Sequence, residues 1–190
     1  PNYSVLYTHE VKNGKKCAID ISQYPIAEKF LLENKEILES RTYIKKAKRN
    51  WYEIWVPQQP ENWKKTKLVF PDISEKPIFW ISSDDEVIQG NCYWIISDKN
   101  EDDLLWLALG VGNSSFIEEF YDVNFNNKLY AGRRRFMTQY VENFPLPNPN
   151  LDTSKEIISL SKKIFSLIDK IDTTDLQQRL NKLVYKAFGL

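Results

Sequence analysis

The sequence predicts an α+β fold: a mixed, largely antiparallel sheet with flanking helices, followed by a C-terminal αα-hairpin. Short apolar stretches separated by turn-forming residues fill residues 67–96, and this spacing favours strands joined as hairpins. After Pro149 the pattern changes to two stretches with apolar residues at helical spacing. We therefore divide the chain into a globular domain, residues 1–149, and a helical hairpin, residues 150–190.

The first third of the chain predicts one helix and one strand. Pro25 suits the first position of a helix, and apolar residues follow it at helical spacing to about Arg41. Residues 51–56, WYEIWV, are rich in aromatic and β-branched side chains and are followed by Pro57, which is typical of a strand. We expect a helix over 25–41 and a strand over 51–56.

The middle of the chain predicts three short strands and then three helices. The strands are KLVF, PIFWI and CYWIIS, at residues 67–70, 77–81 and 92–97. The first helix, residues 102–110, has an acidic first turn that complements its dipole. The others are residues 114–121 and 136–144, the latter stopped by prolines. Pro71-Asp72 is interpreted as a turn, and Gly110-Val-Gly112 as a helix stop rather than a phosphate-binding loop.

The last forty residues predict two capped amphipathic helices. Thr153 with Glu156, and Thr174 with Gln177, have the spacing of capping boxes, and Gly189 has the position of a C-terminal cap. The apolar stripe of this hairpin must pack on the globular part, on a domain outside this chain, or on a second copy. A homodimer through residues 150–190 is therefore one hypothesis.

Composition excludes several classes of protein. The chain has 190 residues, 42% of them apolar, and no apolar run long enough for a membrane span or a secretory signal, so we expect no membrane partner and a cytoplasmic location. Two cysteines and one histidine cannot build a Cys/His zinc site or a disulfide scaffold. No metal-binding acidic motif, methyltransferase cofactor turn or nucleophile–base pair is present, so we expect no catalytic residue, metal or cofactor in this chain.

The zero net charge conceals two basic segments. Residues 41–67 carry eight basic and two acidic side chains, and residues 128–135 carry four basic side chains and no acid. Aromatic residues alternate with the basic ones in both segments. This distribution favours a protein that presents one positive face to phosphates, although solvated surface charge is the alternative.

From Tyr24 onward the chain resembles the TaqI-like C-terminal specificity domain of adenine-N6 DNA methyltransferases and of fused type II restriction-modification enzymes. The matching pieces stand in the family's order: YPIAEKFLLENKEILESR, RNWYEIW, KLVFPDIS, NCYWII, LLWLALGVGNSSFIEEFY, RRRFMTQYVENFPLP and LNKLVYKAFGL. The resemblance implies a target-recognition domain, residues 1–149, that binds double-stranded DNA and follows a methyltransferase domain of the same polypeptide. S-adenosylmethionine would bind in that other domain, and the parent protein would methylate adenine, with or without a fused endonuclease.

Such a domain must neutralise phosphates and offer side chains to base edges. Arginine can serve both purposes, and asparagine can pair with adenine. The candidate DNA-binding residues are Lys48, Arg49, Trp51, Tyr52, Asn91, Tyr130, Arg133, Arg134 and Arg135. Trp51 could instead be a core residue and Asn91 a turn residue. The three arginines are the strongest candidates, because three adjacent guanidinium groups are hard to explain by packing. The alternative function is a protein-interaction module that acts through the hairpin without DNA contact.

Overall fold

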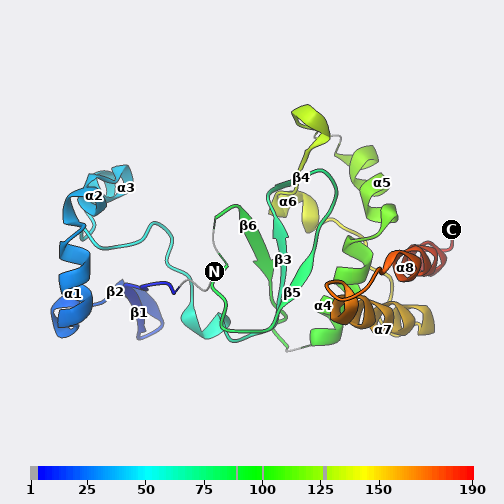
Figure 1. Cartoon of the computed structure of the whole chain (residues 1–190), viewed down its shortest axis with the longest axis horizontal. Coiled ribbons are helices and arrows are strands. Elements are labelled where there is room, and N and C mark those ends of the chain that lie inside the picture. The colour runs from blue at the N-terminus through cyan, green and yellow to red at the C-terminus, as the bar shows by residue number, and fades with distance from the viewer. Residues whose placement is uncertain (1–3, 89, 100, 126–127) are drawn as a thin grey trace. The chain divides into compact units, whose positions relative to one another are not determined.

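The chain folds into two compact units in the computed structural model, Pro1–Asn62 (unit 1) and Trp63–Leu190 (unit 2) (Figure 1). The structure describes residues 4–88, 90–99, 101–125 and 128–190. This division falls after Asn62, whereas the sequence suggested a boundary after Pro149, and the helical hairpin belongs to unit 2. None of the described helices combines the length and the apolar character that a membrane span requires.

Unit 1 begins with a β-hairpin that the sequence analysis did not predict. Strand β1 (His9–Lys12) pairs antiparallel with β2 (Lys15–Ala18). Both residues of the turn, Asn13 and Gly14, have positive φ angles, 52° and 72°. Asn-Gly in this conformation matches the right-handed twist of the two strands of a hairpin. The Asn13-Gly14 dipeptide could therefore have predicted this turn.

The helix predicted over residues 25–41 is wrong as a single element, because the chain forms three short helices. They are α1 (Pro25–Leu32), α2 (Lys35–Ser40) and α3 (Thr42–Ala47). The Asn34 side chain donates to the Phe30 carbonyl and so satisfies a carbonyl of the last turn of α1. Pro25 does stand at the start of α1, as predicted.

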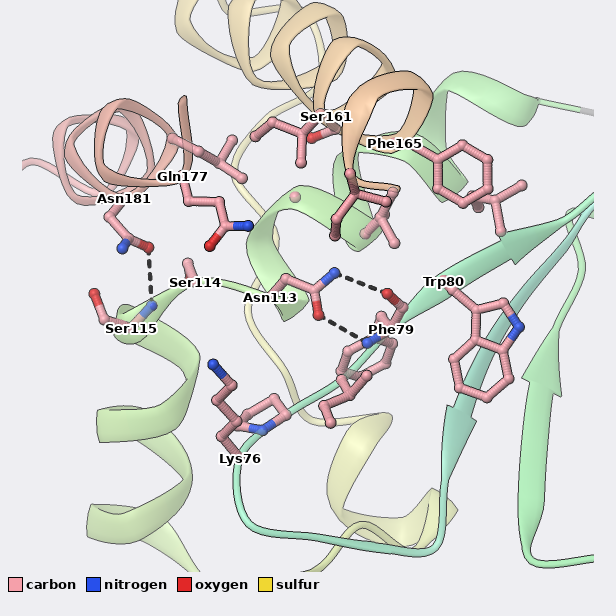
Figure 2. A pocket seen from close by; sticks show the side chains of 18 of the residues that line it. Lys76, Phe79, Trp80, Asn113, Ser114, Ser115, Ser161, Phe165, Gln177 and Asn181 are labelled. Carbon is pink, nitrogen blue, oxygen red and sulfur yellow. Dashed lines mark hydrogen bonds between the residues drawn. The ribbon is translucent and has the colours of Figure 1, made fainter. Parts of the chain in front are cut away.

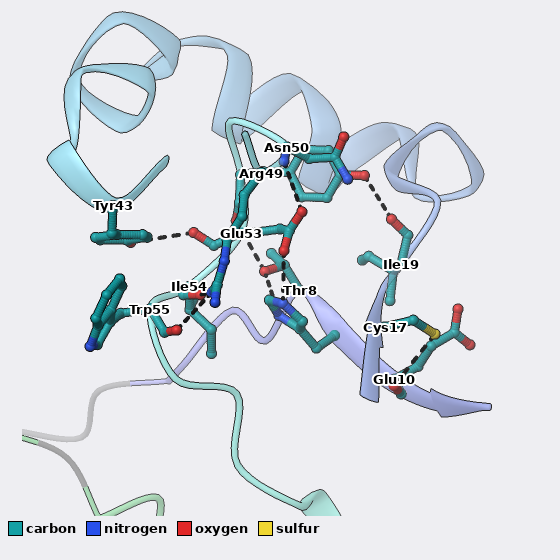
Figure 3. Close-up of polar contacts among 12 residues, drawn as sticks. Thr8, Glu10, Cys17, Ile19, Tyr43, Arg49, Asn50, Glu53, Ile54 and Trp55 are labelled. Atoms are coloured by element: carbon teal, nitrogen blue, oxygen red, sulfur yellow. Dashed lines mark hydrogen bonds and ion pairs between the residues drawn. The ribbon is translucent and has the colours of Figure 1, made fainter. Parts of the chain in front are cut away.

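The strand predicted over residues 51–56 is also wrong. These residues form turns and bends whose carbonyls are taken by arginine side chains (Figure 3). Arg49 Nη1 donates to the carbonyls of Ile54 and Trp55, at 2.9 and 2.7 Å, and Arg41 Nη2 to that of Trp51, at 2.8 Å. Carbonyls bound in this way are not available to a neighbouring strand.

Unit 2 contains the predicted antiparallel sheet. Its central strand, β3 (Lys67–Pro71), lies between β5 (Trp80–Ser82) and β6 (Cys92–Ile95). Val69 is opposite both Trp80 and Trp94, and it is fully buried together with its neighbours on the strand. The strand has buried residues on both faces, which explains why KLVF is a continuous apolar run rather than an alternating one.

A second, two-stranded ladder joins the segment after β3 to the basic loop. Strand β4 (Ile73–Ser74) pairs antiparallel with β7 (Arg134–Arg135), with Ile73 opposite Arg135. Residues more than 60 positions apart in sequence therefore share backbone hydrogen bonds. This pairing attaches the triple-arginine segment to the scaffold.

Unit 2 contains the five predicted helices in the predicted order, although α6 is shorter than the predicted 136–144. They are α4 (Asp102–Gly112), α5 (Ser115–Asn124), α6 (Thr138–Val141), α7 (Asp152–Leu167) and α8 (Thr174–Ala187). Helix α4 packs on the sheet through β3 and β5, and on the hairpin through α7 and α8 (Figure 1). Two apolar clusters result, one on each side of α4.

The ends of the hairpin helices differ in part from the prediction. The N-cap residues are Leu151 and Thr173, one position or more before the expected capping boxes. At the other end Gly189 has φ +77°, its N–H donates to Lys186 O, and the Leu190 N–H donates to Tyr185 O. This is a Schellman motif and confirms the predicted cap.

Gly112 is the last residue of α4, so the helix does end at the Gly110-Val-Gly112 segment, two residues beyond the predicted end at Gly110. Gly110 itself lies inside the helix. A Cβ atom at Gly110 would lie 2.3 Å from Ser161 Oγ and 2.8 Å from Ile157 Cγ2, both on α7. A Cβ atom at Gly112 would lie 2.8 Å from the Phe79 ring. Figure 2 shows this region, where the Asn113 side chain also pairs with the backbone N–H and carbonyl of Phe79. The glycines allow the sheet and α7 to approach α4 closely.

We predict that Gly110→Ala destabilises the chain by about 1–3 kcal/mol, because the added methyl group overpacks the contact between α4 and α7. Intrinsic helix propensity alone would stabilise this variant by up to about 1 kcal/mol. The sign of the change in the free energy of unfolding therefore distinguishes overpacking from helix propensity. Urea unfolding measures the change, and the cost should shrink in a Ser161→Ala background, where the hydroxyl is absent. Equal stability of Gly110→Ala and wild type would contradict the close-packing explanation.

Candidate functional site

The basic loop, residues 128–135, is a narrow turn with two outward-facing side chains at its tip. The Leu129 N–H donates to Arg133 O at 2.7 Å, and Lys128 pairs with Arg134 in an antiparallel bridge. Between them Ala131 and Gly132 both have positive φ, 59° and 72°. Tyr130 is 85% exposed, and Arg133 is exposed as well.

Arg134 points the other way and is buried, with 8% of its surface exposed. Its Nε and Nη2 bind the two Asp122 carboxylate oxygens at 2.7 and 2.8 Å, and Nη2 also lies 3.0 Å from Glu118 Oε1. Its Nη1 donates to the Glu75 carbonyl. All three nitrogens of the guanidinium group are therefore engaged, and this bidentate geometry is the strongest that an arginine makes with a carboxylate.

Asp122 is the anion at the centre of this network. Lys128 Nζ lies 3.0 Å from Asp122 Oδ2, on the same carboxylate that binds Arg134. Hydrogen bonds from Arg134, and then from Lys128, lower the pKa of Asp122 to about 2. The carboxylate therefore stays ionised in the folded chain at all but strongly acidic pH.

Arg135 is held by Asp72, a residue that the sequence analysis interpreted as part of a turn. Arg135 Nε lies 3.2 Å from both Asp72 carboxylate oxygens, and Nη2 lies 3.1 Å from Oδ2. The Asp72 backbone binds too: its N–H donates to Asn91 O and its carbonyl accepts from Phe136 N–H, both at 2.6 Å. Asp72 is buried and bends the chain between β3 and β4, so it joins two of the candidate segments.

Tyr121 binds the backbone of strand β7 at Arg135. Its side chain is fully buried, and its hydroxyl donates to Arg135 O at 2.7 Å. Burial raises the pKa of Tyr121 to about 12, so the hydroxyl remains a donor over the whole physiological range. The carbonyl, the side chain and the backbone ladder of Arg135 are all bound to the scaffold.

These contacts divide the triple arginine by role. The argument that three adjacent guanidinium groups cannot serve packing fails for Arg134, and Arg135 has a partner although its side chain is half exposed. Among the described residues Arg133 makes no ion pair or hydrogen bond through its side chain. In unit 2 Asp72 links Asn91 to Arg135. Tyr130 and Arg133 are the exposed candidates at the tip of the loop.

The candidates of unit 1 form a separate group around the turn after α3 (Figure 3). Lys48 is exposed and ends α3 in the left-handed conformation, φ 51°. Arg49 binds the turn carbonyls, as described above. Trp51 is half-buried beneath Lys35 Nζ, at 5.6 Å, and the Tyr52 hydroxyl donates to Ile19 O at 2.8 Å. The structure therefore gives Arg49, Trp51 and Tyr52 roles within the fold.

The basic segment before β3 also contributes less surface charge than its composition suggests. Lys67 is fully buried, and its ammonium donates to the carbonyls of Lys65 and Asp84 at 3.1 and 2.9 Å. Burial lowers the pKa of Lys67. This lysine caps the loop ends around β3 and is not available to a phosphate.

Sequence reasoning missed an aromatic pair of unit 1, the half-buried Tyr43 and the exposed Trp55. Their ring centroids are 5.1 Å apart, and Trp55 is 58% exposed. Trp55 stood inside the strand predicted over residues 51–56, and Tyr43 lay just after the helix predicted over residues 25–41. The only sequence signal was the position of Trp55 beside Val56 and Pro57, where a strand could not continue.

The described residues contain no group of three or more His, Cys, Asp or Glu side chains that could hold a metal ion. The single histidine, His9, is buried with its Nε2 3.4 Å from Glu53 Oε2, and burial lowers the pKa of His9. A neutral imidazole in this position is part of the hairpin's attachment to the turn at Glu53.

We predict that Arg134→Ala and Arg133→Ala have very different effects on stability. Arg134→Ala leaves Glu118 without this partner and Asp122 with only Lys128, and it should cost about 3 kcal/mol, whereas Arg133→Ala should change stability by less than about 0.5 kcal/mol. Urea denaturation of the two variants at neutral pH measures the difference. If both variants were equally stable, Arg134 would not hold the loop.

We also predict how Asp122 contributes to acid sensitivity. Its pKa is depressed in the folded chain, so its stabilising contribution is complete above the unfolded value of 3.8 and is lost as the pH falls towards about 2. Asp122→Asn should therefore be less stable than wild type at pH 7 but should lose less stability between pH 5 and pH 2. The exposed Asp98→Asn is the control and should follow the wild-type curve.

Comparison with known proteins identifies the family. A model of the TaqI-like C-terminal specificity domain matches residues 5–146. The type II methyltransferase M.BanIII of Aneurinibacillus aneurinilyticus is 46% identical over 191 positions, which cover 100% of this chain and 33% of that protein. M.MjaIV of Methanocaldococcus jannaschii is 28% identical over 88% of this chain and 57% of its own length. M.PaeR7I of Pseudomonas aeruginosa is 25% identical over 90% of this chain and 28% of its own length.

The chain thus spans between about a quarter and just over half of the length of these type II methyltransferases. The match to the family model covers both the turn after α3 and the loop with the three arginines. The chain belongs to the family of TaqI-like C-terminal specificity domains.

Proposed function

We propose that this domain recognises a sequence in double-stranded DNA on behalf of an S-adenosylmethionine-dependent adenine-N6 methyltransferase domain in the same polypeptide. Family membership and relatives that are type II methyltransferases support this proposal. The parent protein would belong to a cytoplasmic restriction-modification system. S-adenosylmethionine would bind outside the residues described above, and the methyl transfer would take place there.

The observation that carries the proposal is the rigidly held tip of residues 130–133. Tyr130 and Arg133 are exposed on a turn whose two sides are joined by the Leu129–Arg133 hydrogen bond and the Lys128–Arg134 bridge. The ion pairs of Arg134 and Arg135 hold its C-terminal side. An exposed side chain on a fixed backbone can meet a partner with little loss of conformational entropy. An arginine in such a position can bind a phosphate, or the O6 and N7 atoms of guanine in the major groove.

Arg135 and Asn91 extend this surface at its base. Arg135 has a half-exposed side chain, and Asn91 is exposed on the other side of Asp72. Because Asp72 fixes both segments, Arg133, Arg135 and Asn91 would contact DNA with a set spacing. Phosphate contacts would define the register, and base contacts would supply specificity.

Adenine methylation adds a requirement for this surface. The target base must leave the duplex to reach a catalytic pocket, and the flanking base pairs must be held meanwhile. A domain that grips the flanking duplex through fixed arginines meets this requirement. The catalytic chemistry itself needs no residue of this chain.

The alternative function, a protein-interaction module that uses the hairpin stripe, loses its motivation. The stripe residues Ile157, Leu180 and Val184 are buried against α4 and α5 within unit 2. A homodimer through residues 150–190 would need a different surface, so we do not propose it.

We predict that Arg133→Ala weakens binding to duplex DNA and lowers the salt dependence. Loss of one phosphate contact should reduce the slope of log K against log salt by about 1. Fluorescence anisotropy with a labelled duplex, titrated at several salt concentrations, measures both quantities.

The matched control is Lys163→Ala, which removes one exposed positive charge from α7 in the same unit. It should leave affinity and slope unchanged within error. If Arg133→Ala behaved like this control, the loop tip would not be part of the DNA interface.

A further inference from the structure

Beyond duplex recognition, we propose that unit 1 has a second nucleic-acid site, an aromatic notch that takes one unpaired nucleobase of single-stranded DNA. The notch is an open cavity of about 540 Å³. Its lining residues are Thr42, Tyr43, Lys46, Ala47 and Trp55. The site lies wholly in unit 1 and shares no residue with the loop of residues 128–135.

Trp55 is the ring of the notch that is most open to a flat partner. Their centroids are 5.1 Å apart and their planes are tilted by 59°, so the rings of Tyr43 and Trp55 do not stack on each other face to face. Trp55 is 58% exposed and lines the cavity, and Figure 3 shows its indole beside the Tyr43 ring. An exposed, unstacked indole offers the kind of surface on which single-stranded bases stack, whatever their sequence.

The rings are also fixed in place. The Tyr43 hydroxyl donates to Glu53 O at 3.3 Å, and the guanidinium of Arg41 lies 5.0 Å from the centre of the Tyr43 ring. Arg49 lies 5.7 Å from the centre of the Trp55 ring and donates to the Trp55 carbonyl. Since these contacts hold the aromatic pair before any ligand arrives, binding would need little reorganisation.

The positive charge around the notch favours a polyanionic ligand. Residues 41–55 carry five basic side chains and one acidic side chain. The acid, Glu53, is engaged by the Asn50 N–H at 2.8 Å and by His9. Lys45, Lys46 and Lys48 are exposed on and just after α3. Aromatic faces among cations match a nucleic-acid strand, with its bases on the rings and its phosphates on the lysines, better than they match an uncharged apolar peptide.

Single-stranded rather than double-stranded DNA is the fitting ligand. In a duplex every base already stacks on its neighbours, and its face cannot enter a notch without paying for unstacking. An unpaired base has a free face and a flexible backbone. A domain that works beside an enzyme that unpairs DNA would have access to such a base.

Anisotropy titrations of the full chain with a labelled 12-nucleotide oligothymidylate at low salt test the proposal. Wild type should bind, and Trp55→Leu should weaken binding by about tenfold, in line with the loss of one stacked base. Trp55→Phe should keep most of the affinity, since it retains an aromatic face. The matched control is Val56→Ala, a neighbouring apolar residue that is 65% exposed, and it should bind like wild type.

Two results would overturn the notch. One is an oligothymidylate affinity that Trp55→Leu does not change or that wild type lacks, in which case a protein segment would be the better occupant. The other is an equal loss of oligothymidylate and duplex binding in Trp55→Leu, which would exclude a base-stacking role. A failure of the proposal for the loop would give a different result. Duplex binding by Arg133→Ala would then equal that of wild type, whereas the oligothymidylate binding of the Trp55 variants would not be affected.

Discussion

The arrangement of the loop depends on one ion pair, between the buried Arg134 guanidinium and the partly buried Asp122 carboxylate. Arg134 also binds Glu118 and the Glu75 carbonyl, so it connects α5, the segment after β4 and the loop itself. Removing a guanidinium group from water is costly unless its donors are bound, and here each of its three nitrogens is. Because the Arg134 side chain is held inside unit 2, Arg133 and Tyr130 of the same loop are exposed to solvent.

Much of the fold was predictable because its signals are local. The apolar run before Pro71 and the acidic start of α4 indicated the sheet and its covering helix, and Gly189 indicated the final cap. The errors occurred where a side chain competes with backbone pairing. Nothing in WYEIWV shows that Arg49 will bind the carbonyls of that segment and prevent a strand. Likewise, Gly110 is a contact glycine only because Ser161, fifty-one positions later, packs on it.

The candidate site was predictable in its residue types but not in its orientations. Three adjacent arginines indicated an anion-binding loop, yet only tertiary contacts separate the inward Arg134 from the outward Arg133. Asp72 was missed because its partners, Arg135 and Asn91, are remote in sequence. Trp55 stood in the strand predicted over residues 51–56, and the bend that exposes it is absent from the sequence pattern.

The central claim is that the ion pair of Arg134 orients a DNA-binding tip, and the duplex affinity of Asp122→Asn tests it most directly. This substitution removes a negative charge next to the loop, so long-range electrostatics alone would strengthen DNA binding. If the carboxylate acts by holding Arg134 and hence Arg133, duplex affinity should instead fall, although no group proposed to touch DNA has changed. Unchanged or tighter binding by Asp122→Asn, with the fold intact, would contradict the account.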